Sequence, residues 1–266
     1  MAHSDYYAQI DRYAYINKLS KCSPLTKAFF ALSTLVITVS AQSIVVPIIV
    51  FVIMTTLVLQ LAGIKARFYV ALLRYPTFMV SISCLIIALF SFNGGEALAQ
   101  LSFNGFTYAI YRSGVALAIT IFFRVEGALS CLFFLVLTTS ITDLSLLLRR
   151  AHVPITLIEI STLIYRYIFV FLEVAEQMTI AQTMRLGKGG WMKKIRGLAL
   201  LAGNLFIRAL EQAERTFTAM SSRGYDGTIR VLDEFPRSNK VVLAAIVVFD
   251  VLLAVAVFLT LNFGVI

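Results

Sequence analysis

Residues 239–262 read NKVVLAAIVVFDVLLAVAVFLTLN, and Lys240 and Asp250 are the only charged side chains in this run. A helix rises about 1.5 Å per residue, so about 20 apolar residues cross a hydrocarbon layer of roughly 30 Å. The run shows no alternation of apolar and polar residues, which argues against a membrane β-strand. We therefore predict a membrane-spanning helix here.

Other apolar runs lie at 25–43, 44–62, 70–92 and 107–140. Charged residues make up 14% of the chain, and the mean hydropathy is +0.87. Soluble domains carry roughly 25% charged residues. The sequence thus predicts an all-α polytopic membrane protein with about five transmembrane helices. It also favours contact with a lipid bilayer over nucleic acid as the explanation for the net charge of +9.

The distribution of Lys and Arg predicts the orientation. Segments 1–27 and 62–74 carry several of these residues, whereas 91–106 carries none. Cytoplasmic loops are enriched in Lys and Arg. The N-terminal segment 1–24 is therefore expected on the cytoplasmic side of a prokaryotic cell membrane. Four spans in 25–140 then return the chain to the cytoplasm. Residues 141–238, which are rich in Arg and Lys, form a predicted cytoplasmic coupling domain, and 239–266 contains the last span.

The run 107–140 is too long for one perpendicular span, because 34 helical residues extend about 50 Å. Arg124 and Glu126 interrupt its middle and are costly against lipid, so both are expected as buried polar residues in an internal contact or a transport path. An alternative topology splits this run and adds a span at 154–172. It ranks second, because it places Arg149 and Arg150 outside.

Two long helices are predicted in the coupling domain, from Pro154 towards Gly187 and over 192–223. Each ends with an arginine followed by a glycine: Met184-Arg185-Leu186-Gly187 and Ser222-Arg223-Gly224. Such an ending stabilises a helix C-terminus by about 1 kcal/mol, which is one explanation. The alternative is that each guanidinium enters a carboxylate-lined groove of a soluble partner and forms paired hydrogen bonds there.

The sequence AMSSRGYDG (219–227), together with LAGNLFIRALEQAERTFTAM, IYRYIFVFLEVAEQ and TTSITDLSLLLRRAHVP, resembles the T component of energy-coupling-factor transporters, and among these the cobalt-type CbiQ family. That family has two Ala-Arg-Gly motifs at the ends of coupling helices. The second resembles Ser222-Arg223-Gly224, with serine replacing alanine. The first resembles Met184-Arg185-Leu186, with the glycine displaced to Gly187.

The resemblance implies a crossed pair of coupling helices whose arginines dock in grooves of two cytoplasmic ATPase subunits. It also implies a substrate-binding membrane S component, similar to CbiM, and a small accessory membrane subunit. The implied function is that of a non-catalytic coupling subunit in an ATP-driven importer of cobalt, with nickel or a vitamin as alternatives. A self-contained channel or secondary carrier using Arg112, Arg124 and Glu126 is the alternative from a different class.

Motifs for other chemistry are missing from the sequence. GKGG at 187–190 lacks the spacing of a phosphate-binding loop, so no ATP hydrolysis by this chain is expected. His3 and His152 are the only histidines, and neither lies at metal-ligand spacing with a carboxylate or thiol. We therefore expect no bound metal and no cofactor. Cys22, Cys84 and Cys131 are far apart and are expected as free thiols.

Overall fold

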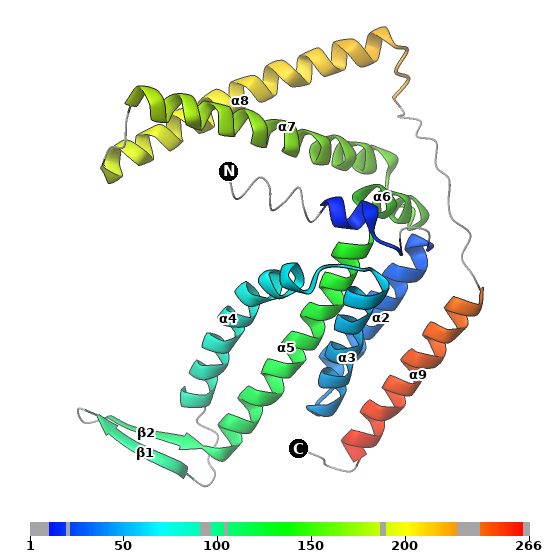
Figure 1. Cartoon of the computed structure of the whole chain (residues 1–266), viewed down its shortest axis with the longest axis vertical. Coiled ribbons are helices and arrows are strands. Elements are labelled where there is room, and N and C mark those ends of the chain that lie inside the picture. The colour runs from blue at the N-terminus through cyan, green and yellow to red at the C-terminus, as the bar shows by residue number, and fades with distance from the viewer. Residues whose placement is uncertain are drawn as a thin grey trace. The chain divides into compact units, whose positions relative to one another are not determined.

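The structure is a computed structural model that describes residues 11–19, 22–90, 97–103, 106–186, 190–227 and 240–262. Its elements are α2 (Pro24–Ser40), α3 (Val45–Thr56) with the π-helical turn η1 (Leu57–Leu61), α4 (Ala66–Phe90), β1 (Ala97–Phe103), β2 (Phe106–Tyr111), α5 (Arg112–Thr138), α6 (Ile141–Arg150), α7 (Ile155–Leu186), α8 (Trp191–Ser222) and α9 (Lys240–Asn262) (Figure 1). The chain divides into two compact units. One unit holds α2 to α5, the two strands and α9, and the other holds α6 to α8.

The helical class predicted from the sequence is confirmed. Within the described residues, four helical segments are long and apolar enough to cross a membrane: Ala66–Leu89, Arg112–Thr138, Ile155–Arg185 and Val242–Thr260. Two shorter apolar helical segments, Pro24–Ser40 and Val45–Leu61, correspond to the first two predicted spans. Because Ile155–Arg185 has the composition of a span as well, length and hydropathy fit both topologies considered above.

The length of the run 107–140 has a simple explanation. Its first residues belong to β2, which pairs antiparallel with β1 from Phe103↔Phe106 to Ala97↔Tyr111, and the helix begins only at Arg112. The remaining 27 residues extend about 40 Å, which a tilted helix accommodates. The expected single helix over 107–140 was therefore too long, and the sequence analysis did not predict the hairpin.

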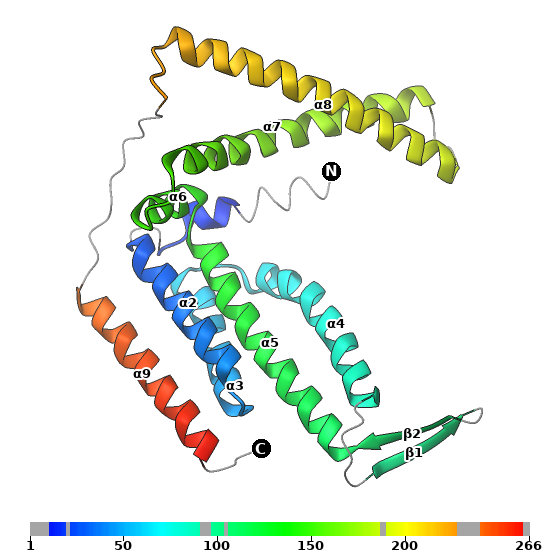
Figure 2. The same ribbon diagram turned by 180° about the vertical axis from the view of Figure 1, so that it is seen from behind.

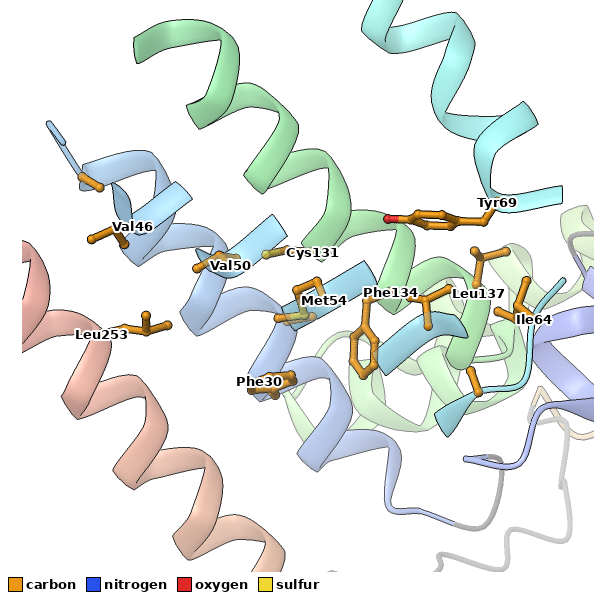
Figure 3. Packing of buried hydrophobic residues seen from close by; sticks show 14 residues of the cluster. Phe30, Val46, Val50, Met54, Ile64, Tyr69, Cys131, Phe134, Leu137 and Leu253 are labelled. Atoms are coloured by element: carbon orange, nitrogen blue, oxygen red, sulfur yellow. The ribbon is translucent and has the colours of Figure 1, made fainter. Parts of the chain in front are cut away.

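Helix α5 is the centre of the first unit and packs against α2, α3 and α4. The buried core of this unit is drawn in Figure 3 and includes Phe30, Val50, Met54 and Phe134, with Leu253 contributed by α9. Gly127 allows the close approach, because a Cβ there would lie 2.9 Å from Thr38 Cγ2 and 3.0 Å from the Pro47 carbonyl oxygen. Small residues at such contacts let helix backbones come together where lipid gives no hydrophobic driving force.

The start of α2 and the end of α5 lie at the same end of this unit. Lys27 is 5% exposed, and its Nζ donates to the Thr138 carbonyl oxygen at 2.7 Å. The Asn17 amide donates to the same oxygen at 3.4 Å. The last carbonyls of a helix have no partner within the helix and attract a cation. These contacts agree with four consecutive antiparallel passes between residues 24 and 138.

In the second unit, α8 crosses α7, as Figures 1 and 2 show. At the crossing the Tyr167 hydroxyl and Thr216 Oγ1 are 2.5 Å apart. Pro154 stands immediately before α7, where a proline costs no helical hydrogen bond. Taking the two helices together, most of their apolar side chains are not covered by other parts of this chain. Ile164, for example, is 55% exposed and Phe217 is 62% exposed.

Candidate functional site

The C-terminal end of α8 is a complete Schellman turn. The Tyr225 N–H donates to the Met220 carbonyl oxygen at 3.1 Å, and the Gly224 N–H donates to that of Ser221 at 3.1 Å. Gly224 has a φ of +76°, which a glycine adopts without steric cost. The glycine of the Ser222-Arg223-Gly224 motif therefore ends the helix and fixes the backbone from which Arg223 projects.

Arg223 is exposed at this end, and no hydrogen bond or ion pair joins its side chain to another described residue. Ser222 is exposed as well, and its hydroxyl donates to the Thr218 carbonyl oxygen at 2.9 Å. The helix-cap explanation accounts for Gly224 but gives the guanidinium no partner. The motif thus combines a structural glycine with an arginine free to bind another molecule.

The end of α7 has a similar exposed arginine. Arg185 lies in the last turn, and the neighbouring Met184 side chain is 82% exposed. Arg185 is exposed too and forms no hydrogen bond or ion pair with the described part of the chain. Leu186 ends α7, but its side chain and all of Gly187 lie outside the described residues.

Two cavities connect these arginines with others that the sequence analysis did not select. A cavity of about 1040 Å³ is lined by Arg166, Arg215 and Arg223, along with Tyr225 and the crossing residues. A second cavity of about 730 Å³ is lined by Arg185, Arg208 and Arg215. Arg215 therefore borders both cavities.

A signal for two of these residues was present in the sequence. Arg208, Arg215 and Arg223 follow one another at steps of seven and eight, which places them on one side of α8. Arg166 lies on α7 and shares a cavity with Arg223 only through the crossing of the helices. Periodicity within one helix could not reveal it.

Positive charge dominates this site. The carboxylate of Glu211 lies 3.6 Å from Arg215, and the two side chains are 57% and 74% exposed. An exposed pair of this kind is worth less than about 1 kcal/mol, so it leaves Arg215 able to bind elsewhere. Guanidinium groups form paired, planar hydrogen bonds with carboxylates, and these cavities are accordingly suited to acidic groups of a partner.

Tyr225 follows the motif and contacts α7. Its hydroxyl donates to Glu159 Oε2 at 3.1 Å. A tyrosine hydroxyl is protonated at neutral pH, and burial together with the neighbouring Glu159 carboxylate raises the pKa of Tyr225 further, in keeping with its role as the donor. The sequence analysis selected neither residue.

Arg124 and Glu126 belong to α5 in the other unit. Glu126 is 5% exposed, and its Oε1 has no hydrogen-bond partner among the described residues. Arg124 is half-buried, and its Nε likewise has no such partner. Residues two apart on a helix point in different directions, and no ion pair links these two. Among the described residues there is also no group of three or more potential metal ligands.

Comparison with known proteins covers residues of both units. The family model of the cobalt transport protein CbiQ matches residues 16–232. An uncharacterised protein of Methanocaldococcus jannaschii is 34% identical over 96% of this chain and 94% of its own length.

Two further relatives have more informative names. A putative fused cobalt transport protein CbiMQ of Methanocorpusculum labreanum is 34% identical over 85% of this chain and 38% of its own length. The energy-coupling factor transporter transmembrane protein EcfT of Bacillus selenitireducens is 24% identical over 62% of this chain and 63% of its own length.

Proposed function

The chain belongs to the CbiQ family of cobalt transport proteins, the T components of energy-coupling-factor transporters, and we propose that it couples ATPase subunits to cobalt import. Family membership makes it a multi-pass, non-catalytic membrane subunit of a transporter. The proposal adds the substrate, the partners, the orientation and the residues that transmit force.

The exposed Arg223 at the capped end of α8, which has no hydrogen-bond or ion-pair partner among the described residues, is the observation that carries the proposal. In the proposed complex, Arg223 enters a carboxylate-lined groove of one ATPase subunit, and Arg185 enters the groove of a second. Met184, Leu186 and Gly187 accompany Arg185, and Ser222 and Gly224 accompany Arg223. The interaction of a buried guanidinium with a carboxylate is strong when both groups keep their hydrogen bonds.

The membrane partner is proposed to be a substrate-binding S component. The relative named CbiMQ is a fusion, which supports a partner similar to CbiM for this chain. Cobalt is the proposed substrate because the family model and that relative carry cobalt in their names. Substrate selection would belong to the S component, so nickel or a vitamin is an outcome to be tested.

We further propose that the N-terminus and residues 141–238 face the cytoplasm of a prokaryotic cell, because ATP and its hydrolysing subunits are there. The exposed apolar faces of α7 and α8 would then be covered by partner subunits or by the membrane surface.

The decisive experiment compares Arg223→Ala with Arg196→Ala in the complete transporter. Arg196 is exposed on the same helix but lines neither of the two arginine cavities. We expect Arg223→Ala to lose ATPase subunits during purification and to lose ATP-dependent uptake of radioactive cobalt, while its membrane level stays normal. Full ATPase retention and wild-type uptake by Arg223→Ala would overturn the docking role of Arg223. Uptake of nickel but not cobalt by the parent transporter would overturn cobalt as the substrate.

A further inference from the structure

Helices α7 and α8 are held to each other at their crossing by side chains near Tyr167 and Thr216. A contact at one crossing point does not by itself fix the angle between two long helices. Arg223 lies seven residues, or about 10 Å along the helix, beyond Thr216. A small change in the crossing angle would therefore move the guanidinium of Arg223 relative to α7.

A second contact lies away from the crossing. After the Schellman turn at Gly224, the chain reaches the first turns of α7 through Tyr225. Tyr225 is half-buried there, and its hydroxyl donates to Glu159 at 3.1 Å. Glu159 lies eight residues before Tyr167, so the two contacts are separated by about two helical turns on α7.

Burial makes this contact specific. The Glu159 side chain is 6% exposed, and a buried carboxylate is costly unless donors satisfy its oxygens. The Tyr225 hydroxyl supplies one such donor, and Tyr225 lines the same cavity of about 1040 Å³ as Arg223. Any opening of the two helices at this end would remove a hydrogen bond from a buried acceptor.

We propose that the hydrogen bond between Tyr225 and Glu159 is a strut that fixes the angle between α7 and α8 and so positions Arg223 for the ATPase. Both are positioning residues, which act through Arg223. The inference rests on the proposed docking role of Arg223. It adds a reason why the residue after the Ser222-Arg223-Gly224 motif is a tyrosine.

The first test measures the angle directly. Spin labels at Ser161→Cys on α7 and Ser221→Cys on α8, both exposed, report the distance between the first turns of α7 and the last turn of α8. The labelled protein lacks the native cysteines. We expect one narrow distance distribution in the parent protein and a clearly broader one in Tyr225→Phe, which loses only the hydroxyl. Glu159→Gln keeps a carbonyl acceptor and should stay narrow, whereas Glu159→Leu should broaden. Tyr75→Phe removes an exposed hydroxyl on α4 and is the control.

The second test measures retention of the ATPase subunits by the complete transporter. We expect Tyr225→Phe to reduce it several-fold, Glu159→Gln to restore most of it relative to Glu159→Leu, and the double variant Arg223→Ala/Tyr225→Phe to be no worse than Arg223→Ala alone. If Arg223→Ala releases the ATPase but Tyr225→Phe keeps a narrow distance distribution or full retention, the strut is wrong and the docking role stands. If Arg223→Ala itself has no effect, the docking role fails first.

Discussion

Ser33 on α2 donates a hydrogen bond of 2.6 Å to Asp250 Oδ2 on α9, across 217 positions of the chain. Asp250 lies in the middle of Val242–Thr260, the most apolar of the four long candidate spans, whose mean hydropathy is 3.0. A carboxyl group at this depth is expensive unless it meets another polar group. The contact therefore gives α9 a specific position against α2, which uniform aliphatic packing does not provide.

Substitution of Asp250 should separate this polar contact from simple packing. Asp250→Asn keeps a carbonyl oxygen that accepts from Ser33, whereas Asp250→Ala removes the acceptor. Hydrogen bonds between membrane helices are worth about 0.6–2 kcal/mol. We expect the thermal midpoint in detergent to fall further for Asp250→Ala than for Asp250→Asn. Equal midpoints for the two variants would show that the hydrogen bond contributes nothing to stability.

The close packing of α5 makes a second prediction. Gly127→Ala places a Cβ 3.0 Å from the Pro47 carbonyl oxygen and 2.9 Å from Thr38, and a backbone atom cannot move aside cheaply. Overpacking of this kind costs about 1–3 kcal/mol. We expect a lower thermal midpoint for Gly127→Ala in detergent.

Gly203→Ala is the matched control. Gly203 lies inside α8, and a Cβ there would meet nothing within 4 Å. Alanine is favoured over glycine in a helix interior by about 1 kcal/mol. This variant should keep or raise the midpoint, and a fall equal to that of Gly127→Ala would refute the steric explanation.

Much of the helical pattern was predictable because each span and each coupling helix is encoded locally. Pro154 begins α7, Gly224 ends α8, and the apolar runs set the membrane helices within a few residues. The hairpin of β1 and β2 was not predictable in the same way, because β1 lies in segment 91–106, which was expected as a loop, and β2 begins the apolar run 107–140, which was expected as a helix. Lys27 was counted as a loop charge, yet it caps the end of α5.

The site was predictable only where its residues are neighbours in sequence. Arg185 and Arg223 stand at helix ends that a glycine marks, so the pattern alone selected them. Arg166, Glu159 and Tyr225 come together because two helices cross and the chain then turns back. Such contacts depend on the angle between helices, and one sequence contains no local record of that angle.

The orientation of the chain leads to a third prediction. In a protein without native cysteines, a membrane-impermeant thiol reagent should label Gly95→Cys in intact cells, but label Gly189→Cys only after the membrane is opened. The reason is the contrast between segment 62–74, with Lys65, Arg67 and Arg74, and segment 91–106, with neither Lys nor Arg. The opposite labelling pattern would reverse the topology and remove the coupling domain from the cytoplasm.

The fourth prediction ranks the arginines of α8 by what each can offer a partner. Arg223 stands at a capped helix end without a partner in the described part of the chain, whereas Arg215 lies within the helix beside Glu211 and borders both cavities. We expect Arg223→Ala to weaken ATPase binding at least tenfold, which corresponds to about 1.4 kcal/mol. Arg215→Ala should have a smaller effect that is still measurable, because Glu211 already takes part of its charge.

Lysine at position 223 distinguishes charge from geometry in the same experiment. An ammonium group keeps the positive charge but cannot form the paired, planar hydrogen bonds of a guanidinium. Arg223→Lys should therefore bind the ATPase better than Arg223→Ala and less well than the parent. Raising the salt concentration should weaken ATPase binding by Arg223→Lys more than binding by the parent, because a lone charge is more easily screened than a paired contact. Binding can be measured by titrating the purified ATPase subunits onto the protein in nanodiscs. Parent-like ATPase binding by Arg223→Lys would mean that the partner recognises the charge alone. A loss of binding in Arg196→Ala equal to that in Arg223→Ala would mean that the partner recognises only the total charge of α8.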